Sequence, residues 1–72
     1  MGGASMQRQM QLPELSLREN QVAQLIHGGC SNQQIADKLE ISINTVKTTI
    51  RHINAKLKTF DRASLIERLE RI

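Results

Sequence analysis

Residues 42–58 read SINTVKTTIRHINAKLK. The apolar residues of this stretch follow one another at intervals of four, three and four positions: Val46, Ile50, Ile53 and Leu57. This spacing places them on one face of an α-helix. The other face carries polar and basic side chains: Asn44, Lys47, Thr48, Arg51 and Asn54. A helix that buries one side and presents Lys, Arg, Thr and Asn on the other suits the DNA major groove.

The positive charge of the chain is concentrated in the same stretch. The net charge is +3, but residues 42–58 carry +4 and residues 14–41 carry −2. A basic segment has many uses, and the simplest alternative is a solvated helix face. The charge pattern by itself therefore leaves both interpretations open.

Size and composition exclude several classes of protein. A chain of 72 residues forms at most one small domain. Its single cysteine, Cys30, excludes an internal disulfide and a multi-cysteine zinc site. No apolar run approaches the roughly 20 residues that span a bilayer, and the N-terminus lacks the apolar core of a signal peptide. We expect a cytoplasmic protein with no membrane partner.

Local capping patterns predict four helices. Ser16 with Glu19, and Ser31 with Gln34, fit the capping box, and Ser42 and Asp61 are expected N-caps. Gly28 and Gly29 should end the first helix. We also expect Phe60 to pack on Leu65 as a hydrophobic staple. Residues 1–13 show no period, so we expect a flexible lead, partly derived from a cloning vector, and a folded domain over residues 14–72.

The second and third helices are separated by only three residues, Glu40, Ile41 and Ser42. Two helices joined by so short a turn must cross steeply, which is helix-turn-helix geometry. The sequence thus predicts an all-α fold, a compact four-helix domain whose second and third helices form a helix-turn-helix.

Specific residues along the chain match a known family. They are Leu15-Ser16-x-Arg18-Glu19, Gly29-x-Ser31-Asn32-x-x-Ile35-Ala36-x-x-Leu39-x-Ile41-Ser42-x-x-Thr45-Val46-Lys47, Ile53-x-x-Lys56-Leu57 and Arg62. This pattern resembles the LuxR-type (GerE-like) DNA-binding domain over roughly residues 14–72. The resemblance implies the C-terminal effector domain of a bacterial transcription regulator, binding a palindromic or direct-repeat operator in double-stranded DNA. It also implies a homodimer on DNA, with RNA polymerase as a further candidate partner.

Positions carried over from the family give the candidate site. The base readers would be Lys47, Thr48 and Arg51, of which Arg51 can pair with guanine. Phosphate contacts position a helix without reading sequence, and helix starts attract phosphates; Thr49 and Lys56 complete the candidates taken from the helix starts. The phosphate candidates are Ser31, Asn32, Ser42, Asn44, Thr45, Thr49 and Lys56. Arg62 is either a phosphate contact or a structural ion pair.

Two positions depart from the family. Thr49 stands where the family commonly has His, and it keeps a hydroxyl for a phosphate but no positive charge. Lys58-Thr59 stands where the family usually has Gly-Val. Lysine in a left-handed C-cap costs about 1 kcal/mol relative to glycine, so another geometry is expected at this helix end. Lys58 also adds one candidate phosphate contact.

The last helix offers candidate dimer contacts, Ile66, Leu69 and Ile72, although ordinary core packing is the equal alternative for them. A helical protein-interaction module would use this helix and no DNA. Another alternative is a sigma-factor-like promoter-reading domain, which resembles this family over the helix-turn-helix and would act with RNA polymerase. Neither His27 nor His52 has a second ligand at a recognisable spacing, so we expect no metal, no cofactor and no enzymatic activity.

Overall fold

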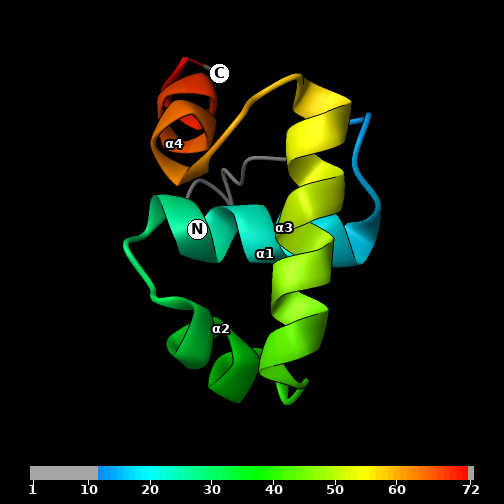
Figure 1. Cartoon of the computed structure of the whole chain (residues 1–72), viewed down its shortest axis with the longest axis vertical. Helices are drawn as coiled ribbons and strands as arrows, with labels where there is room; N and C mark the ends of the chain where they lie inside the picture. The colour runs from blue at the N-terminus through cyan, green and yellow to red at the C-terminus, as the bar shows by residue number, and fades with distance from the viewer. Residues whose placement is uncertain (1–11, 72) are drawn as a thin grey trace, which may run out of the picture.

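The computed structural model describes residues 12–71, which form four α-helices and no strand among them (Figure 1). They are α1 (Leu17–His27), α2 (Asn32–Leu39), α3 (Ile43–Leu57) and α4 (Arg62–Glu70). The all-α fold with four helices is confirmed. In Figure 1, α3 runs along the long axis of the molecule and α1 runs across it, with α2 beside the N-terminal part of α3.

Each helix begins at the residue whose side chain caps it. Ser16 Oγ accepts the N–H of Glu19 at 3.2 Å, and Ser31 Oγ accepts that of Gln34 at 3.1 Å. In both cases the third helical residue bonds back to the cap, so both predicted capping boxes are present. The N-caps Ser42 and Asp61 are likewise confirmed. Because a cap is worth about 1 kcal/mol, these four residues fix where the helices start.

Three helices are followed by a residue with positive φ. Gly29 (φ 92°) follows α1, Glu40 (φ 58°) follows α2 and Lys58 (φ 60°) follows α3. The expectation that Lys58 avoids the left-handed conformation was wrong. Its N–H bonds the carbonyl of Asn54, and the next N–H, of Thr59, bonds the same carbonyl at 2.9 Å. These bonds close the end of α3 and offset the cost of a non-glycine residue there.

The core draws side chains from all four helices, and those with no exposed surface are Val22, Ile35, Val46, Ile53 and Leu65. The predicted staple between Phe60 and Leu65 was wrong. Phe60 is 90% exposed, whereas Leu65 is fully buried among the other core residues. The backbone of Phe60, and not its side chain, is tied to α4: its N–H donates to Ser64 Oγ at 2.9 Å.

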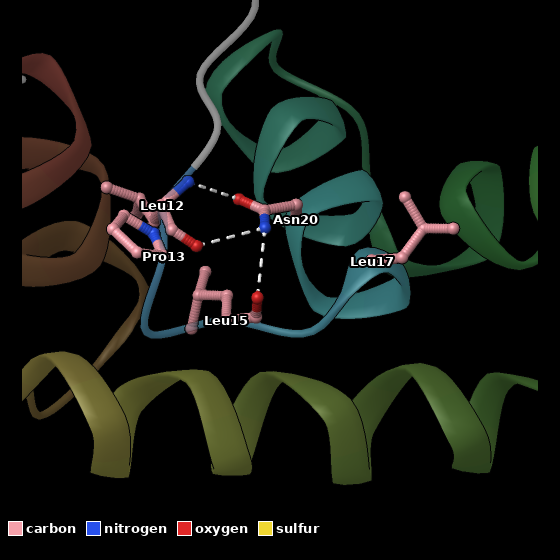
Figure 2. Close-up of a pocket in the computed structure, with 5 residues that line it drawn as sticks. All are labelled: Leu12, Pro13, Leu15, Leu17 and Asn20. Carbon is pink, nitrogen blue, oxygen red and sulfur yellow. Dashed lines mark hydrogen bonds between the residues drawn. The ribbon is translucent and has the colours of Figure 1, made fainter.

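The folded unit begins before the predicted boundary at residue 14. Leu12 is buried, and its N–H and carbonyl both bond the buried side chain of Asn20, at 2.8 and 3.2 Å (Figure 2). The Asn20 amide also donates to the carbonyl of Leu15. Asn20 therefore holds the chain entering α1 against the core. The predicted flexible, vector-derived lead otherwise lies in residues 1–11, outside the described residues.

Candidate nucleic-acid interface

The turn between α2 and α3 is fixed by its backbone and by one apolar side chain. Glu40 takes the left-handed conformation, and the N–H of Ile41 bonds the carbonyl of Ala36 at 3.0 Å. The half-buried side chain of Ile41 packs against the core, and Ala36 is buried between the elements. The two helices are thereby locked in the arrangement of a helix-turn-helix.

Four of the five polar residues expected on the outer face of α3 are exposed, Asn44, Lys47, Thr48 and Arg51, whereas Asn54 is half-buried. The inner face of α3 is buried at Val46 and Ile53, as the apolar spacing predicts. Within residues 12–71, none of the four outer side chains makes a hydrogen bond or an ion pair. This face therefore offers two cations, an amide and a hydroxyl to a partner outside the domain.

The start of α3 uses its own hydroxyls. Ser42 Oγ accepts the N–H of Thr45 at 3.1 Å, and the two hydroxyl oxygens lie 2.9 Å apart in a second hydrogen bond. Both side chains are exposed, so each keeps part of its hydrogen-bonding capacity. Their first role is to cap the helix, and a phosphate contact would come in addition to that role.

Thr49 lies on the inner side of α3. It is only 9% exposed, and its hydroxyl donates to the carbonyl of Thr45 at 2.7 Å. A hydroxyl that bonds the preceding turn is satisfied within its own helix. This placement turns the Thr49 side chain away from the outer face, and a phosphate contact at this residue remains only a prediction.

Lys56 joins the far end of α3 to α1. Its Nζ lies 2.8 Å from Glu19 Oε1, and the Glu19 side chain is only 10% exposed. The hydrogen bond from Lys56 lowers the pKa of Glu19 below its ordinary value, and a backbone hydrogen bond from Ser16 lowers it further. Lys56 was predicted to contact phosphate, whereas Glu19 was predicted only as a capping residue. Since the two lie 37 positions apart, no local pattern could have paired them.

Arg62 joins α4 to the start of α2. Its guanidinium donates to Asn32 Oδ1 at 2.7 Å and to the backbone carbonyl of Cys30. Arg62 therefore has a structural role, as one of the two alternatives predicted, but it acts through hydrogen bonds and not through an ion pair. Asn32 is half-buried and engaged by Arg62, whereas the neighbouring cap Ser31 is exposed.

The candidate dimer contacts on α4 differ in exposure. Leu69 is 2% exposed and belongs to the core, so it is covered within one chain. Ile66 is half-buried and packs against the core with part of its side chain outside. Ile72 lies outside the described residues. Ile66 is thus the described candidate with surface left for a second copy.

Comparison with known protein families identifies the group to which this helix-turn-helix belongs. Residues 13–69 match the family described as bacterial regulatory proteins, luxR family. The chain belongs to this LuxR family. Membership supports a role in DNA-binding transcription regulation and not in enzymatic catalysis.

Two relatives illustrate the family relationship. The HTH-type transcriptional regulator MalT of Yersinia enterocolitica is 40% identical over 68 residues, which cover 86% of this chain and 8% of that protein. The monoamine regulon transcriptional regulator of Klebsiella aerogenes is 39% identical over 54 residues, covering 75% of this chain and 24% of that protein. The chain thus spans less than a quarter of either relative's length. No solved structure matches the chain.

Residues 12–71 contain no group of His, Cys, Asp and Glu side chains that could hold a metal ion. None of the helices among these residues is long and apolar enough to cross a membrane.

Proposed function

We propose that this chain is a sequence-specific, double-stranded DNA-binding effector domain of a bacterial transcription regulator acting in the cytoplasm, with α3 in the major groove. The supporting observation is the outer face of α3, where Lys47, Thr48 and Arg51 are exposed and without partners among the described residues. A recognition helix reads bases with the side chains of its first turns. These three residues lie in the N-terminal and central turns of α3.

Each base reader has a chemistry that fits a base edge. The Arg51 guanidinium can pair with O6 and N7 of a guanine, and Lys47 can donate to the same acceptors. Thr48 can set its methyl group against a thymine methyl. One good bidentate pair is worth about 1–3 kcal/mol of discrimination, so Arg51 should carry the largest share.

Phosphate contacts would position α3 without reading sequence. Ser31, Asn32, Ser42 and Thr45 lie at the starts of α2 and α3, where helix N–H groups attract anions. Lys58 is exposed beyond the end of α3 and has no ion pair among the described residues. Lys56 is less suited, because its charge already faces Glu19.

The domain would act within a longer regulator that binds DNA as a homodimer. The relatives are much longer regulators. From the resemblance to the LuxR family, we infer that the domain acts at the C-terminus of such a protein. A homodimer fits a domain that reads only one short half-site: on a palindromic operator Ile66 would lie at the two-fold contact, and on a direct repeat the two domains would stand head to tail. RNA polymerase would be a further partner of the bound regulator.

A pair of variants tests the proposed reading of α3. Binding should weaken steeply with salt, because phosphate neutralisation releases counterions. Arg51→Ala should relax sequence preference at one base pair. Lys58→Asn, which removes a charge but tolerates the left-handed backbone, should weaken specific and random DNA alike. Equal losses on specific and random duplexes for both variants would contradict base reading by α3.

A further inference from the structure

Asn44 lies opposite the buried face of α3 and not on one of the helix's sides. Asn44 precedes Val46 by two positions, and Arg51 precedes Ile53 by two positions. Two positions correspond to about 200° around a helix, which is about 160° measured the other way. Because Val46 and Ile53 are fully buried, Asn44 and Arg51 lie nearly opposite the core, at the centre of the outer face.

Asn44 and Arg51 also form one line along the helix. They are seven residues apart, a spacing that drifts by only about 20°. Lys47 lies about 60° away from Asn44, on one flank of this line, from which its long side chain still reaches the base edges. A helix in the major groove directs the centre of its outer face at the base edges and its sides at the two backbones. Asn44 therefore lies where a base reader is expected, about two turns before Arg51.

The amide of Asn44 has no use inside the domain. The residue is exposed, and among the described residues its side chain makes no hydrogen bond. Ser42 and Thr45 cap the helix start between them, so Asn44 is not needed there. An adenine offers N6–H and N7 side by side, which satisfies both the oxygen and the nitrogen of an amide. A phosphate offers only acceptors and would leave the amide oxygen unpaired at the interface.

We propose that Asn44 is a base-reading residue whose amide pairs with N6 and N7 of an adenine, near the guanine read by Arg51. The assignment rests on the proposed function and replaces the phosphate contact expected for this residue from its place at the start of the helix. Seven residues rise about 10.5 Å, so the two base pairs lie at most about three steps of 3.4 Å apart along the DNA. Thr48, between them on the same face, would meet the intervening base pair.

Selection of bound sequences from random duplex DNA tests the assignment with three proteins: wild type, Asn44→Ala and Arg51→Ala. The wild-type motif should contain an adenine within about three base pairs of a guanine. Asn44→Ala should lose about tenfold in preference for the adenine and keep the guanine, and Arg51→Ala should do the reverse. Both side chains are exposed, so unchanged urea midpoints would show that the variants fold.

A base analogue provides the sharper measurement. Replacing the selected adenine by 7-deazaadenine removes N7, which should weaken wild type and Arg51→Ala several-fold but leave Asn44→Ala unaffected. The same analogue at an adenine outside the motif is the control. An Asn44→Ala protein that binds every sequence more weakly by one factor, with its motif unchanged, would overturn this inference alone. A wild-type protein without any sequence preference would overturn the proposed function as well.

Discussion

Lys56 Nζ donates a hydrogen bond to Glu19 Oε1 at 2.8 Å, joining the last turn of the proposed recognition helix to the first turn of α1. The same carboxylate oxygen accepts the N–H of Ser16 at 2.8 Å. Glu19 therefore caps α1 and holds the far end of α3 at once. The orientation of α3 relative to α1 thus depends on this carboxylate as well as on the apolar core.

We expect Glu19→Gln to lower the free energy of unfolding by about 1 kcal/mol, since it removes a partly buried ion pair while an amide can still serve the capping box. Urea unfolding without DNA measures the change. Glu67→Gln, which breaks the exposed pair with Arg71, is the matched control and should cost less. Equal costs for the two variants would show that the pair with Lys56 has no special structural role.

The same pair should make stability depend on pH. The hydrogen bond from Lys56 holds the pKa of Glu19 below its ordinary value of 4.5. A carboxyl whose pKa is lower in the folded state adds stability above its unfolded pKa and loses that stability as pH falls through its folded pKa. The free energy of unfolding should thus fall as pH is lowered from 7 to 3, and by less in Glu19→Gln. Parallel pH profiles for the two proteins would contradict this.

Arg62→Lys should destabilise the domain by about 1–2 kcal/mol, because an ammonium cannot reproduce the forked hydrogen bonds to Asn32 and Cys30. Thermal and urea unfolding measure the loss, and Arg71→Lys at an exposed ion pair is the control. Arg62→Gln removes the charge, so at a temperature where it is folded its salt dependence of DNA binding should match that of wild type. A shallower salt dependence in Arg62→Gln would point to a phosphate contact instead.

Lys58→Gly should raise the free energy of unfolding by about 1 kcal/mol, because Lys58 holds φ at 60° without the freedom of glycine. For a domain of this size the melting temperature should rise by about 4–8 °C. Lys58→Ala removes the same charge but keeps Cβ, so it should bring no gain. A similar rise in both variants would attribute the effect to charge and not to the backbone.

Thr49→Val should change DNA affinity less than about twofold, because the Thr49 hydroxyl is bonded to the carbonyl of Thr45 on the inner side of α3. The loss of that bond should cost about 1 kcal/mol or less of stability. Titration of DNA and of urea separates the two effects. A large loss of affinity at unchanged stability would return Thr49 to the phosphate contacts.

The sequence by itself determined where the helices begin and which face of α3 is buried. Caps at Ser16, Ser31, Ser42 and Asp61 act over three or four residues, so their hydrogen bonds follow from local order alone. The period of apolar residues likewise needs only the geometry of one helix. The residues that match the LuxR family were also visible without a structure.

Only the tertiary structure decided how the outer side chains divide between structural and binding roles. Lys56 and Glu19 are 37 positions apart and Arg62 and Asn32 are 30 apart, so their contacts arise only once the helices have packed. Packing also left Phe60 in solvent. A side chain's charge and spacing are properties of the chain, whereas its partners are set by the elements that packing brings beside it. Packing thus gave Lys56 and Arg62 hydrogen-bond partners inside the domain. It left Asn44, Lys47 and Arg51 exposed on the outer face of α3.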